Sequence, residues 1–226
     1  AEVLIPLPSY TQKFSDSKTH AVYSIGHMGS YQTGEEGTGS HPGIDIRAPE
    51  GTPIRSIANG IVTQVRDSDG FGKLIVIRHP HMPDPEDPMS ATVLHSVYAH
   101  LGEQFVTEGE VVRKGQEIGL SGSTGIVTGP HLHFQIDRDN AEWHPYWPFT
   151  STDLQRTGWT LMEAINKGLK QEQGYAHTVN PMLFVQANFP PLPVVTVGEE
   201  TPALTVLPET ETSHRARILA TMTARR

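Results

Sequence analysis

The protein has 226 residues, no cysteine and a formal net charge of −8 at pH 7, from 17 basic and 25 acidic residues. This length suits one domain with appendages, and it allows a core to be buried without covalent cross-links. Because cysteine is absent, disulfides and cysteine nucleophiles are excluded, and a metal would have to be held by nitrogen and oxygen. The acidic balance argues against a nucleic-acid-binding protein, and no apolar run reaches the roughly 20 residues that cross a bilayer.

Residues 1–40 form an N-terminal segment and loop that precede the main domain. They are rich in Gly, Ser and Thr, and residues 33–40 predict a flexible loop that leads the chain to His41. The first nine residues lack the charged-then-apolar layout of a signal peptide, but a mature chain whose signal had been removed would share that trait.

Short runs of β-forming residues alternate with glycine turns along the next hundred residues. This pattern predicts a mainly β fold, an antiparallel sheet or sandwich. The strands are expected at residues 52–57, 60–66, 73–78, 92–100, 110–112, 117–121 and 131–137. Asp69 and Gly70 predict a hairpin turn, whereas the four prolines within 79–88 predict a loop that leaves the sheet, because proline donates no ladder hydrogen bond.

After the last strand, residues 138–178 predict an aromatic and helical insert. The aromatic stretch 143–149 is expected to seal the edge of the domain rather than to bind a ligand. One long helix is predicted at about 152–170, where Trp159 and Met162 belong to an apolar series at helical spacing and are interpreted as packing residues.

The C-terminal region differs from the rest in composition. Five prolines lie at positions 190, 191, 193, 202 and 208, and Thr/Glu-rich and basic stretches follow them. We therefore expect residues 187–226 to form an extended, partly disordered tail.

Two clusters of histidine carry the chemistry. His131 and His133 flank Leu132, and in a strand the alternation of side chains would place both histidines on one face and Leu132 toward apolar packing. Far upstream, His41 and Asp45 supply an imidazole and a carboxylate, which are ligand types for a first-row metal. Together these residues predict a zinc site, but by themselves they leave open whether His131 or His133 binds the metal.

The segment 96–100 is expected to border this site. If it is a strand, alternation places Tyr98 and His100 on one face, so Tyr98 is predicted to lie near the site. A packing role for Tyr98 is at least as well supported as a catalytic one.

Several motifs occur in a fixed order along the chain. They are His41-Pro-Gly-Ile-Asp45, Tyr98-Ala-His100-Leu, Val112-Arg-Lys-Gly-Gln116-Glu-Ile-Gly119, Gly122-Ser-Thr-Gly125 and Gly129-Pro-His131-Leu-His133-Phe. This order resembles the lysostaphin-like zinc metalloendopeptidases, a family of peptidoglycan hydrolases, over about residues 41–137. The sequence departs from the family pattern at Gln135, where an acidic residue commonly stands, in its long glycine-rich entry and in the insert.

The resemblance implies a role for each matching residue. His41, Asp45 and His133 would hold Zn²⁺, with a fourth position left to water, whose pKa such a site lowers. His100 and His131 would be catalytic, one as a base and the other as a donor to the oxyanion or leaving amine, in an order that the resemblance does not give. The remaining histidines receive no site role: His20, His27, His79, His81, His95, His144, His177 and His214.

The resemblance also implies an activity. We expect residues 41–186 to form a zinc endopeptidase domain with a substrate groove, acting on peptidoglycan peptides outside the cytoplasm, in the periplasm, in the cell envelope or as a secreted protein, and as a monomer. Two alternatives are a catalytically silent family member that binds or regulates another cell-wall hydrolase, and a biotinyl or lipoyl carrier modified at Lys114. The histidine clusters favour the enzyme, because a carrier leaves them unexplained.

Overall fold

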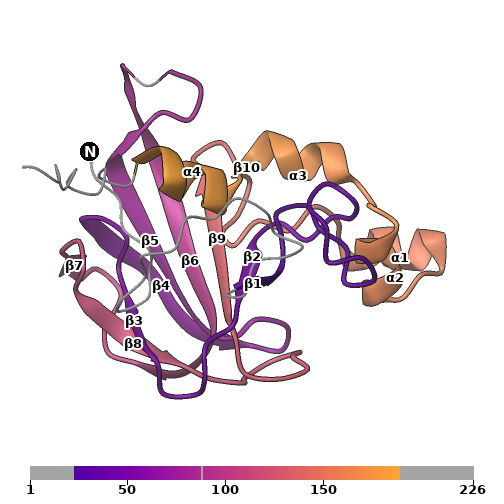
Figure 1. Cartoon of the computed structure of the whole chain (residues 1–226), viewed down its shortest axis with the longest axis horizontal. Coiled ribbons are helices and arrows are strands. Elements are labelled where there is room, and N and C mark those ends of the chain that lie inside the picture. The colour runs from indigo at the N-terminus through magenta and orange to yellow at the C-terminus, as the bar shows by residue number, and fades with distance from the viewer. Residues whose placement is uncertain (1–22, 88, 189–226) are drawn as a thin grey trace, which may run out of the picture. The chain divides into compact units, whose positions relative to one another are not determined.

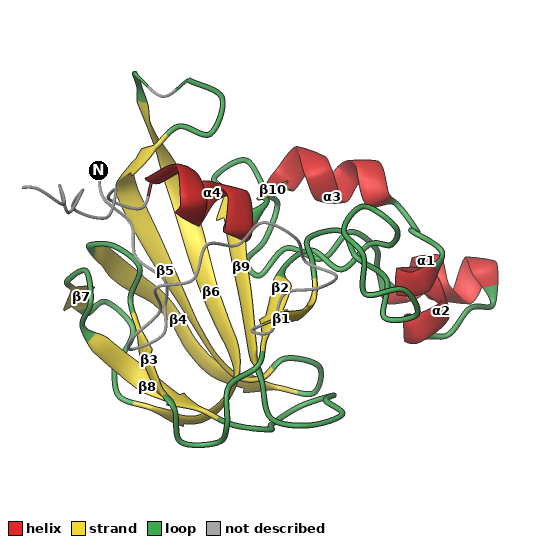
Figure 2. Ribbon diagram, viewed as in Figure 1, coloured by secondary structure: helices red, strands yellow, loops and turns green. Residues whose placement is uncertain are grey.

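The computed structural model describes residues 23–87 and 89–188. Within them, one antiparallel sheet of ten strands dominates, and four short helices lie around it (Figures 1 and 2). The strands are β1 (Tyr23–Ile25), β2 (Ile44–Ile46), β3 (Pro53–Arg55), β4 (Gly60–Ser68), β5 (Gly72–Pro83), β6 (Ala91–Gln104), β7 (Val111–Val112), β8 (Glu117–Ser121), β9 (Leu132–Arg138) and β10 (Thr178–Val179). The mainly β fold predicted from the sequence is confirmed.

The strand order brings distant parts of the sequence together. The main path runs β1-β2-β9-β6-β5-β4-β7, with β10 beside β9, β3 beside β8, and β8 joined to β6. Strand β9 therefore lies between β2, which contains the end of the first histidine motif, and β6, which ends beyond His100. The three segments that carry the motifs are neighbours in the sheet.

The proline-rich segment behaves differently from the prediction. We expected residues 79–88 to leave the sheet, but β5 continues to Pro83. The register with β6 shifts between His79 and Met82, so an irregularity accommodates the missing donor of Pro80. The loop that does leave the sheet is shorter, and it extends beyond the ends of β5 and β6 (Figure 2).

A β-bulge in β6 reverses the expected direction of one site residue. Ile75 pairs with Tyr98 and Lys73 pairs with Leu101, so two residues of β6, Ala99 and His100, lie opposite one residue of β5. His100 adopts the left-handed region with φ of 60°. The extra residue breaks the alternation, and Tyr98 and His100 therefore face opposite sides of the sheet.

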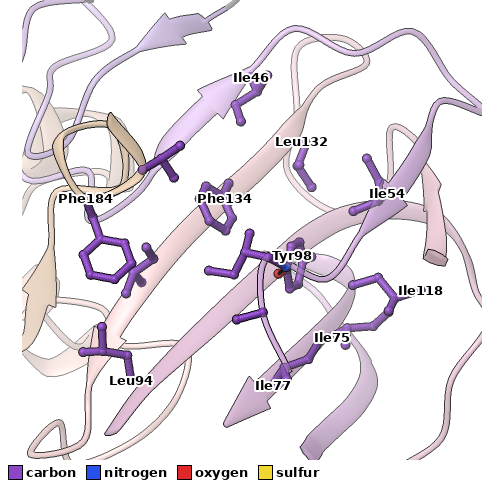
Figure 3. Close-up of a cluster of buried hydrophobic side chains, with 14 of the residues drawn as sticks. Ile46, Ile54, Ile75, Ile77, Leu94, Tyr98, Ile118, Leu132, Phe134 and Phe184 are labelled. Carbon is purple, nitrogen blue, oxygen red and sulfur yellow. Dashed lines mark hydrogen bonds between the residues drawn. The ribbon is translucent and has the colours of Figure 1, made fainter. Parts of the chain in front are cut away.

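The main core covers the face to which Tyr98 points. Its ring packs with Phe134 at 5.6 Å between centroids, and its hydroxyl accepts a hydrogen bond from Ile57 N at 3.0 Å (Figure 3). The prediction that Tyr98 lies near the site is therefore wrong, and its packing role is confirmed. Leu132, Phe134 and Ile136 of β9 also belong to this core, which leaves His133, Gln135 and Asp137 on the opposite face.

The single long helix expected at about 152–170 is instead two helices. They are α1 (Ser151–Thr157) and α2 (Leu161–Asn166). Gly158 ends α1 in the left-handed conformation, and Thr160 begins α2 with a capping box to Glu163. These stop and start signals outweigh the helical spacing of the apolar residues.

Two further helices follow, α3 (Gln171–His177) and α4 (Pro181–Asn188). Helix α4 packs Phe184 and Val185 into the main core, and Figure 1 shows it crossing the sheet near β6 and β9. The predicted tail begins at residue 187, so its first two residues lie in α4 and the remainder lies outside the described residues. No described helix is long and apolar enough to span a membrane.

Candidate metal centre

Asp45 and His133 are placed opposite each other by the sheet. They are direct partners in the antiparallel register of β2 and β9. Because Ile44 and Ile46 point into the core, alternation turns Asp45 to the other face, toward His133. Asp45 Oδ1 lies 3.2 Å from His133 Nδ1, and both side chains are buried.

His41 reaches the same point from the loop that precedes β2. Its Nδ1 lies 3.1 Å from the carbonyl oxygen of Gly43, and since a carbonyl only accepts, Nδ1 carries the proton and Nε2 carries the lone pair. His41 Nε2 lies 3.0 Å from His133 Nδ1 and 3.3 Å from Asp45 Oδ1. A Cβ on Gly43 would lie 2.7 Å from Phe134 O, so only glycine allows this loop to approach β9 so closely.

The three inner atoms form a triangle that fits a tetrahedral metal ion. Its sides measure 3.0, 3.2 and 3.3 Å. Ligands that bind zinc at about 2.0–2.2 Å with tetrahedral angles lie about 3.3 Å apart. Within the described residues, His41, Asp45 and His133 are the one group of three such side chains that converges in this way.

Electrostatics at this point keep Asp45 in its ionised form. Burial opposes ionisation of Asp45, but His41 and His133 beside it outweigh burial and hold the pKa of Asp45 well below its ordinary value. Burial lowers the pKa of His133, partly offset by its hydrogen bond to Asp45. A deprotonated carboxylate and an unprotonated imidazole are the forms that bind metal.

The two predicted catalytic histidines lie beside this triangle. The ring centroids of His100 and His131 are 4.7 Å apart, and His131 Nε2 is 3.6 Å from Asp45 Oδ2. Each donates its Nδ1 proton to a backbone carbonyl, His100 to Thr124 and His131 to Gly129, both at 2.8 Å. Burial, reinforced by the neighbouring imidazoles, lowers the pKa of His100 to about 4.

All five predicted site residues line one cavity of about 600 Å³. The cavity is bordered by apolar side chains, including Phe71 beside the hairpin turn and Ile126 in the loop before β9. The insert contributes Trp147 and Met162. Met162 is largely exposed and borders the cavity, so its predicted packing role is wrong. Trp147 borders the cavity and also packs with Phe149 in a small core, and the prediction that stretch 143–149 seals an edge rather than binds a ligand stays a prediction.

Tyr31 is a site residue that sequence reasoning missed. Its hydroxyl donates to Asp45 Oδ2 at 3.3 Å, and its ring meets His41 edge to face at 5.4 Å between centroids. Burial and the Asp45 charge raise the pKa of Tyr31, so it remains a donor. The available signal was weak: Tyr31 is the aromatic residue within the glycine-rich loop that leads to His41.

A second cluster of histidines lies further along the sheet, with His95 buried in β6 and His144 half-buried in the segment after β9. His95 stacks on His144 with ring centroids 3.7 Å apart and planes 15° apart. His95 Nε2 pairs with Asp139 and His144 Nδ1 pairs with Asp137, each at 3.0 Å. Each imidazole thus faces its own carboxylate.

Comparison with known proteins identifies the domain that contains the candidate metal centre. Residues 39–145 match the sequence profile of Peptidase family M23. The chain belongs to peptidase family M23. The matched segment contains His41, Asp45, His100, His131 and His133, and the resemblance stated from the sequence motifs is confirmed.

Curated relatives of this M23 domain carry names of cell-wall enzymes. The chain is 42% identical over 95 residues to the DD-carboxypeptidase/endopeptidase Mpg of Neisseria meningitidis, covering 42% of this chain and 19% of that protein. It is 38% identical over 96 residues to the peptidoglycan DD-endopeptidase ShyA of Vibrio cholerae, covering 42% and 20%. The M23 chain thus spans about a fifth of the length of these relatives.

Among solved structures, the M23 chain is similar to the catalytic domain of lysostaphin from Staphylococcus simulans. The two are 32% identical, and the match covers 52% of this chain and 77% of that domain, with a TM-score of 0.37.

Proposed function

We propose that this chain is a zinc-dependent endopeptidase that hydrolyses amide bonds in the stems or cross-links of bacterial peptidoglycan. The observation that carries the proposal is the convergence of His41 Nε2, Asp45 Oδ1 and His133 Nδ1 within 3.0–3.3 Å of one another in a cavity wall. Membership of the M23 family and relatives named as peptidoglycan DD-endopeptidases support the reaction and the substrate class.

The donor set is suited to zinc. Imidazole nitrogen and carboxylate oxygen are both common ligands of zinc. Catalytic zinc sites typically have three protein ligands, whereas structural sites have four. When bound there, zinc would polarise a peptide carbonyl and make a water molecule acidic enough to attack it. Tyr31 holds Asp45 through Oδ2, which leaves Oδ1 directed at the other two ligand atoms.

His100 and His131 would move the protons of the reaction. The backbone carbonyls of Thr124 and Gly129 fix their Nδ1 protons, so the Nε2 atom of each ring is the one that can accept or hold a proton at the cavity. The bulge in β6 turns the side chain of His100 toward the cavity, where it can exchange a proton with the substrate or water. One ring would take the proton of the attacking water, and the other would stabilise the oxyanion or protonate the amine.

The cavity walls would position the substrate. Phe71 and Trp147, at 5.6 Å between centroids, form one apolar contact surface beside the ligands. A peptide lying extended along the sheet would place its scissile carbonyl at the metal and an uncharged side chain on this surface. Peptidoglycan as substrate further implies that the protein acts outside the cytoplasm.

Digestion of purified peptidoglycan with the zinc-loaded full chain tests the proposal. Mass spectrometry should find new amino and carboxyl termini in the released peptides, and these termini name the bond. His100→Ala, which keeps the three ligands, is the matched inactive control. Stoichiometric zinc without any peptide release would reject the enzyme and favour the alternative of a regulator of another hydrolase.

A further inference from the structure

His133 differs from the other site histidines in how its outer ring nitrogen is held. Its Nε2 lies 3.0 Å from the side-chain oxygen Oε1 of Gln135. The outer nitrogens of the other three histidines each face a backbone carbonyl, and these pairs are His41 with Gly43, His100 with Thr124, and His131 with Gly129. A backbone carbonyl can only accept, but an amide side chain can present either its oxygen or its NH₂ group. The tautomer of His133 therefore depends on how the Gln135 amide is oriented.

Two acceptors orient the Gln135 amide. Its Nε2 contacts Asp137 Oδ1, and it also lies 2.9 Å from the carbonyl oxygen of Tyr146. Neither a carboxylate nor a carbonyl can donate, so the NH₂ group must face both of them. The oxygen of Gln135 is then left to face His133.

Asp137 is itself held in place. Its side chain is fully buried, and its Oδ2 accepts from Tyr146 N at 2.9 Å and from His144 Nδ1 at 3.0 Å. His133, Gln135 and Asp137 alternate along β9 and share one face, so the strand aligns them in a row. The row runs from the metal triangle to the segment that follows β9.

The orientation of the Gln135 amide opposes the tautomer of His133 that carries its proton on Nδ1. Asp45 Oδ1 lies 3.2 Å from His133 Nδ1 and would by itself favour a proton on that nitrogen. A proton there would occupy the lone pair that a metal needs. An acceptor fixed at Nε2 removes that tautomer.

We propose that Gln135 is a positioning residue that keeps His133 protonated on Nε2 and its Nδ1 free for a metal ion, and that Asp137 acts by locking the Gln135 amide. This inference rests on the metal-binding part of the proposed function. It does not depend on which peptide bond is cleaved.

Gln135→Met in the full chain is the first test, because it removes the acceptor at nearly constant volume. Zinc affinity, measured by competition with a chromophoric chelator, should fall by about 10–100-fold, the usual effect of losing such an outer contact. In the metal-free protein, ¹⁵N NMR of the histidine rings should show wild-type His133 protonated on Nε2 and the variant redistributed toward Nδ1.

Asp137→Asn is the second test, because it does not touch His133. If the oxygen of the introduced amide serves Tyr146 N, its NH₂ group faces Gln135, which favours the flipped Gln135 amide and the wrong tautomer of His133. Zinc affinity should fall in the same direction but less than for Gln135→Met. The matched control is Asp139→Asn, an acid two residues further on that pairs with His95 and should change neither readout.

Thermal unfolding shows which of the two variants folds. Zinc affinity and the His133 tautomer of either folded variant then test the proposal. Wild-type zinc affinity in a folded variant, or weaker zinc binding with an unchanged His133 tautomer, would overturn the proposal. Zinc binding and tautomers as expected, without cleavage of peptidoglycan by the wild type, would instead contradict the proposed function alone.

Discussion

Two clusters of histidine and aspartate lie on the same face of the sheet, yet only one has the geometry of a metal site. In the first, three atoms of His41, Asp45 and His133 approach one another within 3.0–3.3 Å. In the second, His95 and His144 stack, and each pairs with its own aspartate at 3.0 Å. Residue type alone does not distinguish the two clusters; the convergence of ligand atoms on one point is what makes the first a candidate metal centre.

The physical origin of the difference is the backbone. Register places Asp45 directly opposite His133, and the loop ending at Gly43 adds a third atom from a different direction. His95 pairs across the strands with Asp137, but its Nε2 turns to Asp139 beyond the end of β9. In the second cluster each ring nitrogen that has a partner contacts a separate carboxylate, and among the described residues no three ligand atoms there meet at one point.

The largest effect should follow from breaking the first cluster. Asp45→Ala or His133→Ala removes one of three ligand atoms, so the purified variant should lose stoichiometric zinc and all measurable hydrolysis. Metal analysis by mass spectrometry with a peptidoglycan digest measures both. Normal zinc content in either variant would remove that residue from the ligand set.

A smaller effect is expected at the catalytic pair. His100→Ala or His131→Ala leaves the three ligand atoms in place, so zinc content should stay at wild type while turnover falls by about 100-fold or more, the usual scale for a positioned acid or base. Steady-state cleavage with parallel metal analysis makes the distinction. A variant with full turnover would have no part in proton transfer.

Gly43→Ala tests whether the close approach of the loop makes the first cluster. The added Cβ would lie 2.7 Å from Phe134 O and 2.8 Å from His133 Cε1, so the loop must move away from β9. We expect weaker zinc binding and a loss of about 1–3 kcal/mol in the free energy of unfolding, as for other overpacked sites. An unchanged zinc affinity, measured by competition with a chelator, would show that the loop accommodates the added methyl group without moving away from β9.

The dependence of stability on pH should reveal a buried histidine that lies outside both clusters, His79. Burial lowers the pKa of His79 to about 4, and its ring nitrogens bond Asn59 O and Ser96 Oγ. The unfolded chain binds the proton near pH 6.5 and the folded chain only near pH 4, so stability falls as pH decreases through that window. The slope should be shallower in His79→Gln, by up to about 1.4 kcal/mol per pH unit. Denaturant unfolding at several pH values measures it, and equal slopes would contradict a buried neutral ring.

The smallest effect is expected in the second cluster. His95→Phe keeps the stacked ring and removes a pair with the half-exposed Asp139, while His95 Nδ1 has no partner to lose. Zinc content and turnover should remain at wild type, and the free energy of unfolding should change by less than about 1 kcal/mol. Loss of zinc here would mean that the two clusters are coupled.

Much of the fold was predictable because strand patterns and glycine turns are local signals. All seven expected strands appear, and the Asp69–Gly70 turn joins β4 to β5. The direction of Tyr98 was predicted wrongly because a bulge at His100, which no local pattern announces, breaks the alternation. The helix at 152–170 was wrong because Gly158 and Thr160 interrupt a pattern that spacing alone presented as continuous.

The five candidate site residues were named from motifs, and the structure places all of them at one cavity. Their roles stay predictions until the substitutions are made. Tyr31, Trp147 and the Gln135–Asp137 contact were not foreseen, because each depends on segments that meet only in the folded chain. Sequence motifs indicate which side chains can bind a metal or transfer a proton, whereas tertiary contacts determine how each ring is oriented.

The direct pairing of Asp45 with His133 also bears on how the protein matures. Their separation is fixed by the backbone ladder of β2 and β9, so it is set before any ion arrives. Small metal-dependent domains gain their fold and their ion in one step, but a ten-stranded sheet with its own core has no such need. We expect the demetallated chain to keep its secondary structure and to reload on adding zinc, so that assembly of the polypeptide comes first and metallation second.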